Sequence, residues 1–543
     1  MNRPCRKPDR IEAFESFNEM LRFCAERYGN KTAFSFKCAK DEKKSVSFAG
    51  FYSDIKKIGF ELTRSGLAGQ RIALIGENSY EWIACYFACV CLGGAVIPLD
   101  KELSENELSS LLKRSGAKAV FCSKSFTEKA EAAAAENGLT VIPMQKIRLI
   151  LNKSSSGFSF EKSIPPDTLA GVVFTSGTTG DSKGVLLTHK NLVSNAVSAC
   201  EAVEDYKKCL LILPLHHTFG LVAGVLVPML KGCEVFISSG LRRLTKDIAF
   251  FRPQAIVVVP VMAETVYKKI RANAEANGKS KMLKKAIRLS RILLKLGIDV
   301  RRKLFREFLD SLGGELEGIV CGGAAVDPDC ASGFEDFGIG FFSGYGITEC
   351  SPIVSVNRKR ANKIGSVGQP LSCNSIRITE KDENGVGNVE VKGTNVFSGY
   401  LDGKQNEKES FDNDWFRTGD LGRLDEDGFL TLTGRKKNLI ILSNGKNVSP
   451  EELENALIHS RYISEVVVYE KDKKITAEIF PDRELCGGQT EEKLYEAVDG
   501  FNKTVPVYKN IEKVVIRDSA FPKTTTLKIK RKYESKKGDE AVV

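Results

Sequence analysis

Histidine, tryptophan and paired cysteine motifs are scarce in this sequence. Its 543 residues include four histidines and two tryptophans, and none of its fifteen cysteines forms a Cys-x-x-Cys pair. Cys85, Cys89 and Cys91 lie together in an apolar run with no histidine nearby, which favours packing over metal binding. A structural zinc site is therefore not expected. The scattered cysteines, and polar first residues that do not form a signal peptide, predict a reducing cytoplasmic location.

Uninterrupted apolar runs of membrane-spanning length are also missing. Two uncharged stretches, 82–99 and 209–230, are long enough to cross a bilayer. The first is broken by Gly93, Gly94 and Pro98, and the second by prolines, glycines and histidines. We expect each stretch to form a buried helix and a buried strand joined by a turn.

The overall composition is that of an ordinary globular protein. Hydrophobic residues make up 42% of the chain and charged residues 27%, which argues against disorder and fibrous structure. A chain of this length is expected to fold as two or three domains. The net charge of +11 suits anionic ligands or surfaces, but by itself it does not choose among nucleotides, nucleic acid and membranes.

Most of the chain alternates short apolar, β-branched runs with helical stretches. The runs begin near residues 71, 119, 170, 209, 234, 255 and 318. Continuous apolar runs between helices are typical of mostly parallel strands buried on both faces. The predicted class is therefore α/β, with helices flanking the sheets.

The pattern changes after about Ile376. Alternating strands with Gly- and Asp-rich turns now predict a small antiparallel sheet, and the polar stretch 434–438 is interpreted as a linker. A helix over 450–460, capped by Ser449, and two strands near 466 and 475 predict a compact C-terminal α+β domain. We place the two domains at 1–434 and 435–543.

The segment 268–306 is strongly basic. It holds fourteen lysines and arginines against two acids, and Leu283, Ala286, Ile287, Ser290, Leu293 and Leu294 fall on one helical face. One interpretation is a solvated helix packed on its apolar side. The other is attraction to anionic lipid or to the phosphates of a ligand, where each cation contributes about 1 kcal/mol.

The segment 174–184 (FTSGTTGDSKG) follows an apolar run and carries the strongest chemical signal. Its glycines allow backbone amides to turn inward, while its hydroxyl groups and lysine offer further donors to a phosphate. The spacing does not match a Walker A loop, which needs four residues between its first glycine and Gly-Lys-Ser/Thr. We predict a phosphate cradle built from Thr175, Ser176, Gly177, Thr178, Thr179, Gly180 and Lys183.

This loop resembles the signature loop of the adenylate-forming (AMP-binding) superfamily, which contains acyl- and aryl-CoA synthetases, peptide-synthetase adenylation domains and firefly-type luciferases. Further stretches resemble the family in the same order, so that the likeness runs from about residue 17 to 531: 322–325 (GGAA), 342–349 (FSGYGITE), 415–422 (WFRTGDLG), 434–437 (GRKK) and 521–531 (FPKTTTLKIKR). The resemblance implies ATP, Mg²⁺ and coenzyme A as ligands, and a small C-terminal domain that is mobile.

The same resemblance implies roles on the nucleotide side. Gly323 and Ala324 would form the wall against which adenine lies, because backbone without large side chains can approach a flat base closely. Tyr345 would stack on the base. Asp420 would accept hydrogen bonds from both ribose hydroxyls, with Arg435 assisting.

It also implies roles around the reacting groups. Thr348 would contact the α-phosphate, and Glu349 would hold Mg²⁺, a hard cation that suits a carboxylate shared with polyphosphate. His217, in the stretch LPLHHTFG, would lie near the substrate carboxylate. Lys437 would be the hinge of the small domain, and Lys528 would bridge the carboxylate and the α-phosphate.

The C-terminal motif departs from the family at one position. Leu527 stands where a glycine usually precedes the lysine, and a bulky residue there could alter the loop. Lys523 and Lys530 are the alternatives to Lys528.

The expected function is ATP-dependent acyl-CoA synthesis through an acyl-AMP, with a small-molecule carboxylic acid as substrate and no nucleic-acid partner. The sequence is most similar in texture to bacterial long-chain fatty acid–CoA ligases. The alternatives are a medium-chain or aryl-acid CoA ligase, and an enzyme that loads an acyl carrier protein. Segment 268–306 would give peripheral contact with the inner face of a membrane.

Other classes are less well supported. A P-loop kinase fails on the Walker spacing and would release ADP, and a luciferase-like oxygenase would emit light. A catalytically silent membrane-associated nucleotide-binding protein would be expected to lack Glu349, Asp420, Arg435 and Lys528, which are all present.

Overall fold

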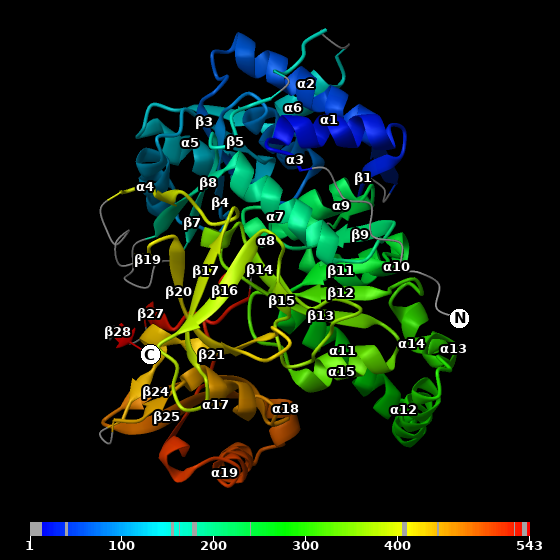
Figure 1. The fold of residues 1–543 in the computed structure, drawn as a ribbon, viewed down its shortest axis with the longest axis vertical. Helices are drawn as coiled ribbons and strands as arrows, with labels where there is room; N and C mark the ends of the chain where they lie inside the picture. Colours follow the sequence, from blue (N-terminus) through cyan, green and yellow to red (C-terminus); the bar gives the residue numbers. More distant parts are fainter. Residues whose placement is uncertain are drawn as a thin grey trace.

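The computed structural model describes residues 13–38, 42–153, 157–161, 163–175, 182–238, 240–403, 410–442, 445–525, 527–534 and 540–542. In Figure 1 the chain runs from two helix-covered sheets (blue to green) through an antiparallel sheet (yellow) to a small C-terminal part (orange to red). The α/β class predicted from the apolar runs is confirmed.

The first sheet is seven-stranded and mostly parallel. Its order is β18-β8-β7-β4-β3-β5-β6, and β8 runs antiparallel to both of its neighbours, β7 and β18. The strands are β3 (Arg71–Ile75), β4 (Ala95–Leu99), β5 (Ala119–Cys122), β6 (Thr140–Pro143), β7 (Leu169–Thr175), β8 (Lys183–Thr188) and β18 (Gly399–Tyr400). Its helices are α2 (Phe48–Arg64), α3 (Tyr80–Val90), α4 (Glu105–Ser115), α5 (Thr127–Ala135), α6 (Met144–Leu151) and α7 (His189–Ala202).

The second sheet is nine-stranded, in the order β15-β14-β13-β12-β11-β9-β10-β1-β2, and is parallel from β13 to β1. Its strands are β1 (Thr32–Lys37), β2 (Lys43–Ser47), β9 (Lys208–Leu211), β10 (Glu234–Ile237), β11 (Ala255–Val258), β12 (Gly318–Cys321), β13 (Gly340–Gly346), β14 (Ile353–Val356) and β15 (Gln369–Pro370). The accompanying helices include α1 (Phe17–Tyr28), α8 (Thr218–Leu221), α9 (Val227–Leu230), α10 (Leu244–Phe251), α11 (Pro260–Ala276), α12 (Ser280–Lys295), α13 (Arg301–Leu304), α14 (Arg306–Ser311) and α15 (Pro328–Asp336).

The antiparallel sheet and the C-terminal part follow. The sheet has the order β16-β17-β20-β19 with β21 on β20, where β16 is Asn374–Thr379, β17 Gly387–Gly393, β19 Phe411–Asp412, β20 Trp415–Leu424 and β21 Leu430–Arg435. Below it in Figure 1, β24 (Ile463–Lys471), β25 (Lys474–Pro481) and β26 (Lys513–Ile516) form a sheet accompanied by α17 (Pro450–Leu457), α18 (Arg483–Cys486) and α19 (Thr490–Asn502). The predicted pairing of the strands near 466 and 475 is confirmed, as antiparallel neighbours.

Both uncharged stretches form the buried elements that were predicted. The first supplies α3, every residue of which is buried, and then β4. Cys85, Cys89 and Cys91 lie in the main hydrophobic core, so their expected role in packing is confirmed. Within the described part of the chain, no helix is both long enough and apolar enough to cross a bilayer.

One local prediction is wrong. Ser449 precedes α17 but makes no side-chain cap, because its hydroxyl donates instead to the carbonyl oxygen of Thr433, at 2.6 Å. The stretch 434–438, interpreted as a linker, is ordered and leads from the end of β21 to the C-terminal part. Gly434 and Arg435 end β21, paired with Leu421 and Asp420, and 436–438 form one 3₁₀ turn.

The basic segment forms α11 to α14. On α12, Leu283, Ala286 and Ile287 pack against the core below them and Ser290 is buried, as predicted. Leu294, which was expected on the same face, is 40% exposed. A second group of apolar side chains, not recognised in the sequence, faces solvent: Met282, Leu289, Ile292 and Leu296.

Candidate active site

The predicted phosphate cradle begins where β7 and β8 meet. Thr175 and Lys183 are register partners at the ends of these strands, and the Thr175 hydroxyl donates to the carbonyl oxygen of Lys183, at 3.5 Å. The other predicted cradle residues (Ser176, Gly177, Thr178, Thr179 and Gly180) lie outside the described residues.

Lys183 and Glu349 converge on a tyrosine that sequence reasoning missed. The Lys183 ammonium lies 5.2 Å from the ring centroid of Tyr400, and the Tyr400 hydroxyl donates to Glu349 Oε1 at 3.0 Å. Tyr400 reaches this position because β18 pairs with β8. Thr348 and Glu349 lie in a 3₁₀ turn after β13. The Lys183 ammonium, the Tyr400 hydroxyl and the Glu349 carboxylate therefore lie close together.

The predicted base and ribose residues contact one another directly. Tyr345 on β13 donates its hydroxyl to Asp420 Oδ2 at 2.5 Å, while Arg435 Nε lies 2.8 Å from Asp420 Oδ1. The register of β20 and β21 pairs Asp420 with Arg435. Tyr345 and Asp420 are both buried, and burial raises the pKa of the Tyr345 phenol, with Asp420 adding to the effect. The phenol therefore stays a hydrogen-bond donor at neutral pH.

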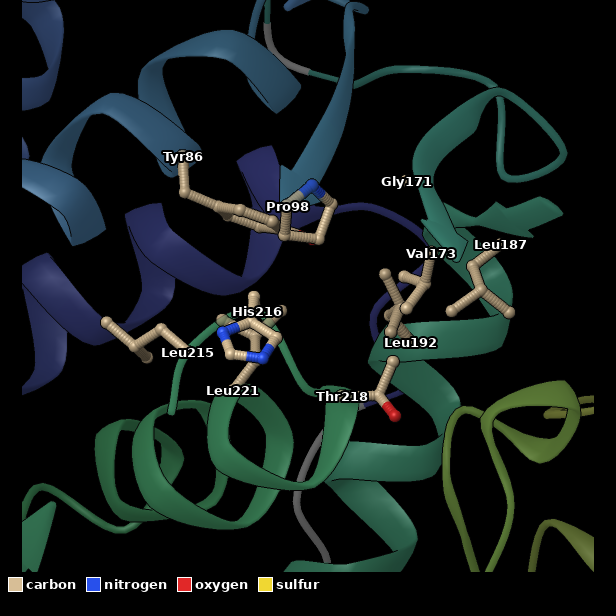
Figure 2. A pocket seen from close by; sticks show the side chains of 10 residues that line it. All are labelled: Tyr86, Pro98, Gly171, Val173, Leu187, Leu192, Leu215, His216, Thr218 and Leu221. Carbon is tan, nitrogen blue, oxygen red and sulfur yellow. The ribbon is translucent and has the colours of Figure 1, made fainter. Parts of the chain in front are cut away.

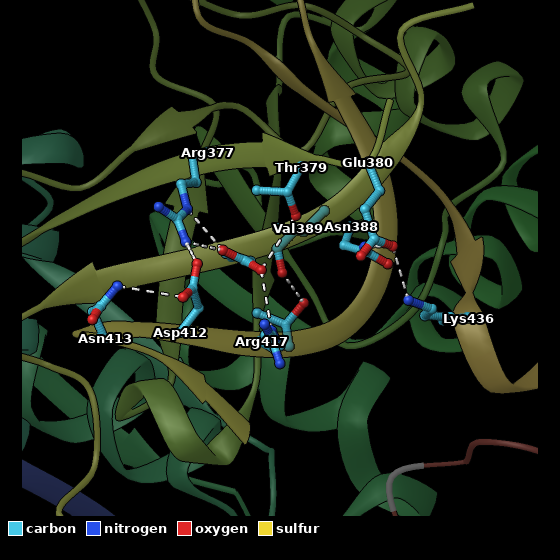
Figure 3. Close-up of polar contacts among 11 residues, drawn as sticks. Arg377, Thr379, Glu380, Asn388, Val389, Asp412, Asn413, Arg417 and Lys436 are labelled. Atoms are coloured by element: carbon cyan, nitrogen blue, oxygen red, sulfur yellow. Dashed lines mark hydrogen bonds and ion pairs between the residues drawn. The ribbon is translucent and has the colours of Figure 1, made fainter. Parts of the chain in front are cut away.

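The antiparallel sheet beneath Asp420 has a charged centre of its own (Figure 3). Glu390 on β17 is 2% exposed and accepts from Arg377 Nε at 2.7 Å and from the Thr379 hydroxyl at 3.2 Å, with Arg417 Nε 3.5 Å away. A buried carboxylate is tolerated when opposite charges and hydrogen bonds compensate it. These contacts tie β16, β17 and β20 into one support for Asp420.

The glycine-rich turn after β12 lies beside the C-terminal lysine. Gly323 has φ +96°, and a Cβ built on it would lie 3.6 Å from Val259 Cγ1 and 3.8 Å from Lys528 Cε. Ala324 follows it in the same turn. A residue with a side chain at this position would therefore adopt a strained backbone conformation, and its Cβ would contact Lys528.

The C-terminal motif forms a tight loop. The Thr524 amide donates to the Lys528 carbonyl, the Lys528 amide donates to the Thr524 hydroxyl at 3.2 Å, and a β-bridge joins Lys523 to Ile529. Leu527 has φ +62°, in the region that favours glycine. The backbone thus keeps the conformation that the usual glycine would take, with a leucine side chain that packs against the core around β11 and β12.

Among the three candidate lysines, the contacts separate Lys528 from the others. Lys523 is held by Glu465 at 2.6 Å, and Lys530 is exposed. Lys528 is solvent-accessible, yet protein surrounds it on several sides, and this restricted hydration lowers its pKa, with the Arg435 cation contributing. A lysine between Gly323 and Arg435 is in reach of a bound nucleotide.

His217, which was predicted to lie near the substrate carboxylate, is buried beside His216 and the C-terminal loop. Burial lowers the pKa of His216 to about 4 and that of His217 to about 3, with Lys101 contributing to the first and His216 to the second. Both imidazoles are therefore neutral at pH 7. Their Nε2 atoms lie 3.2 Å and 3.1 Å from the hydroxyl of Thr525, whose hydroxyl donates to Asp100 at 2.9 Å.

An apolar pocket opens beside His216 (Figure 2). It lies between the seven-stranded sheet, α3, α7 and α8, and its lining is apolar except for the histidine and a threonine: Tyr86, Pro98, Gly171, Val173, Leu187, Leu192, Leu215, His216, Thr218 and Leu221. In this conformation it admits little more than one water molecule. Such a lining suits a hydrocarbon tail whose polar end stays near His216.

The predicted hinge residue, Lys437, is exposed in the turn 436–438, and burial of its stem lowers its pKa, with Arg435 adding to the effect. The preceding Lys436 pairs with Glu380 at 3.1 Å, as Figure 3 shows. The turn therefore follows directly on Arg435, one of the predicted ribose residues.

Sequence reasoning missed Tyr400, Asp100 and Thr525. Asp100 had one weak signal, since it follows a parallel strand at the sheet edge where ligands bind. Tyr400 and Thr525 had none, because their partners are far away along the chain.

Comparison with known proteins identifies the family of the chain. A family model described as AMP-binding enzyme matches residues 21–401, and one described as AMP-binding enzyme C-terminal domain matches residues 437–539. A long-chain-fatty-acid–CoA ligase of Mycobacterium bovis is 31% identical over 437 residues, covering 74% of this chain and 71% of that protein.

Solved structures share the fold. ATP-bound MatB from Rhodopseudomonas palustris has a TM-score of 0.76 at 24% identity, covering 94% of this chain and 97% of that one. An anthranilate CoA ligase in complex with anthranoyl-AMP has a TM-score of 0.79 at 19% identity, covering 97% of each chain.

Proposed function

This chain belongs to the AMP-binding enzyme family, and we propose that it activates a long-chain fatty acid with ATP as acyl-AMP and transfers the acyl group to coenzyme A. The observation that carries the proposal is that Lys528 lies against Gly323 and interacts electrostatically with Arg435 and Asp420, which form one contact group with Tyr345. The curated relative named above supports the acid class.

The first step joins two anions, so positive charge and alignment dominate its barrier. A carboxylate oxygen of the acid attacks the α-phosphorus of ATP, and pyrophosphate leaves with the electron pair of the broken P–O bond. Lys528 would neutralise the carboxylate and the α-phosphate as they approach. Asp420 and Arg435 would hold the ribose, and Tyr345 the base.

Glu349 suits a magnesium ion. Its carboxylate is a hard oxygen donor, and the Tyr400 hydroxyl at 3.0 Å orients it. One protein carboxylate leaves the other coordination positions to phosphate oxygens and water. When bound, the ion would offset the charge of the departing pyrophosphate. Lys183 and the hydroxyl of Thr348 would add their own donors at the same end.

The second step needs room for a thiol. We infer that the residues after Lys437, within the predicted domain 435–543, turn as a unit about Lys437, so that Lys528 leaves and the thiol sulfur reaches the acyl carbon. The C–S bond forms as the C–O bond of the mixed anhydride breaks, AMP leaves and the thiol gives up its proton. The single 3₁₀ turn at 436–438, between β21 and the C-terminal part, supports this division.

The pocket beside His216 supports an apolar acid. Its narrowness means that a long tail must displace side chains such as Leu187 or Leu192. Rates measured against chain length therefore test the proposal more sharply than any single acid does.

The deciding experiment is incubation with Mg-ATP and coenzyme A across acids from acetate to palmitate, with aryl acids included. Pyrophosphate and acyl-CoA should both form, fastest with long fatty acids. If both products form fastest with short or aryl acids, the proposed long-chain substrate is wrong and that acid class takes its place. Pyrophosphate without acyl-CoA would move the acceptor to an acyl carrier protein, and neither product with any acid would end the proposal.

Membrane contact through 268–306 is the finer partner proposal. The exposed side chains Met282 (62%), Leu289 (52%), Ile292 (53%) and Leu296 (70%) recur at helical spacing along α12. On the same helix, no described acid lies within ion-pair distance of Lys281, Lys284, Lys285, Arg288 or Lys295. Apolar side chains flanked by unpaired cations match an anionic lipid surface.

Vesicle sedimentation tests this contact. The protein should bind vesicles containing phosphatidylglycerol, less at high salt, and should bind pure phosphatidylcholine weakly. Changing Leu289 and Ile292 together to Ser should reduce binding several-fold. Leu149→Ser, an equally exposed leucine on α6 (67%), is the matched control and should change nothing. Equal binding by all three proteins would exclude the surface.

A further inference from the structure

The Thr525 hydroxyl contacts three residues that are distant from it in the sequence. Its oxygen lies 2.9 Å from Asp100 Oδ2, 3.2 Å from His216 Nε2 and 3.1 Å from His217 Nε2. Asp100 follows β4 of the seven-stranded sheet, the histidines precede α8, and Thr525 belongs to the C-terminal loop. One hydroxyl group therefore connects the loop to the large part of the molecule.

The protons in this cluster can be assigned from its chemistry. A threonine hydroxyl has one proton and two lone pairs, and a carboxylate only accepts. The Thr525 hydroxyl therefore donates a hydrogen bond to Asp100, and it accepts one from the Nε2–H of each histidine. Each imidazole is neutral at pH 7, since burial lowers its pKa. All three hydrogen bonds of the hydroxyl are used.

The position of Thr525 fixes that of Lys528. The bridge between Lys523 and Ile529, together with the hydrogen bonds between Thr524 and Lys528, closes the loop around both residues. Holding Thr525 therefore holds the ammonium beside Gly323. The other end of the contact is His216, which lines the apolar pocket.

We propose that Thr525 is a positioning residue, which docks the C-terminal loop on Asp100, His216 and His217 and so places Lys528 for adenylate formation. The proposal rests on the proposed function. The contact must break when the loop leaves for thioester formation, so Thr525 acts in the first half-reaction and not in the second. Because His216 also touches the acyl pocket, the docked state of the loop depends on the same residues that receive the acid.

Two half-reactions separate this role from a structural one. Thr525→Val should slow acyl-dependent ATP–pyrophosphate exchange about tenfold or more, since it removes three hydrogen bonds from partly buried partners. It should leave thioester formation from supplied acyl-AMP within about twofold of the unchanged protein. Thr525→Ser, which keeps the hydroxyl, should restore most of the exchange rate.

Thr504→Val is the matched control, because Thr504 is exposed and bonds only within its own turn, to the Phe501 carbonyl. It should leave both rates unchanged. Exchange by Thr525→Val at the unchanged rate would overturn the proposal, as would equal slowing of both half-reactions or a serine variant as slow as the valine variant.

A second measurement does not depend on activity. In the protein without substrates, the amides of Thr524, Leu527 and Lys530 donate within the loop, to Lys528, Thr524 and Pro522. Thr525→Val should speed hydrogen exchange at these amides, and Thr504→Val should not. Unchanged exchange would overturn the docking contact even if the protein makes acyl-CoA. Faster exchange in a protein that makes none would uphold the contact and reject only the proposed function.

Discussion

On the proposed nucleotide side of the site, Tyr345 and Asp420 stand on strands, and short motifs surround them in the sequence. On the acyl side, Asp100, His216 and Thr525 meet although more than a hundred residues separate each from the next. The first side is supported by backbone pairing that also holds the sheets together. The second is held by side-chain contacts that a single rotation can break.

The difference separates two requirements of the proposed chemistry. The nucleotide must be held in both half-reactions, so a rigid sheet suits it. The lysine and the acyl group must meet once and then part, and a loop docked by a few hydrogen bonds can do that within the stability of a folded protein. Mutations on the two sides should therefore give different patterns of loss.

The largest effect is expected from Lys528→Ala. Removing the charge that offsets two approaching anions should lower adenylate formation by about a thousandfold. Thioester formation from supplied acyl-AMP should be largely spared, because the loop has left by then. Lys530→Ala, on an exposed neighbouring lysine, is the control. Equal loss of rate in both half-reactions would show that Lys528 does not act specifically in adenylate formation.

Asp420→Asn should break the nucleotide side in both half-reactions. An amide cannot match the charged contacts with Arg435 at 2.8 Å, and one NH₂ would face a donor. Losing hydrogen bonds to charged groups costs about 1.5–3 kcal/mol each, so we expect a loss of up to about a hundredfold in each step. Full thioester activity with impaired adenylation would show that Asp420 acts only in the first half-reaction, contrary to the role proposed for the nucleotide side.

Much of the nucleotide side could be predicted from the sequence, and little of the acyl side could. Tyr345 and Asp420 stand in motifs that resemble those of the family, whereas on the acyl side only His217 and Lys528 do. Thr525 carries no such signal, because its role depends on Asp100, which is 425 residues away. The exposed apolar side of α12 was missed for a related reason: a 3.6-residue pattern shows that two faces are apolar but not which one the core covers.

The same distinction applies to the secondary structure, where features set by a local sequence pattern could be predicted and features set by distant contacts could not. Continuous apolar runs marked β3 and β5 because parallel strands are buried on both faces. The role of Ser449 could not be predicted, because Thr433 offers its hydroxyl a partner only after β21 and α17 have come together.

Gly171→Leu should alter only the acyl side. Gly171 lines the pocket, and a Cβ there meets nothing closer than Val96 O at 3.7 Å, so the fold should accept alanine. The outer carbons of leucine need the same displacement of lining side chains that an acyl tail needs, and urea denaturation checks that this variant is folded. Adenylation of palmitate should fall about tenfold to a hundredfold, while that of a short acid changes little. Gly171→Ala should lie between. Equal losses for all chain lengths would show that the tail lies elsewhere.

The pH dependence of adenylation sharpens the role of the loop. The pKa of Lys528 is lowered, so its charge is present below that pKa and is lost as pH rises through it, earlier than for an ordinary lysine. Adenylation should therefore decline at alkaline pH, about tenfold per pH unit at most, and thioester formation should not. In Lys528→Arg the charge persists and the decline should disappear. Its persistence would assign the titration to another group.

Leu527→Gly is expected to have the smallest effect, because two consequences oppose each other. A glycine at φ +62° relieves about 1 kcal/mol of backbone strain. It also loses the packing of the leucine against the core and gives the unfolded chain more freedom, together about 1–2 kcal/mol. The net change in unfolding free energy should stay within about 1 kcal/mol, measured by urea denaturation. If adenylation nevertheless falls as far as in Thr525→Val while thioester formation is kept, the leucine side chain is a second docking contact of the loop, and the acyl side is held by packing as well as by hydrogen bonds.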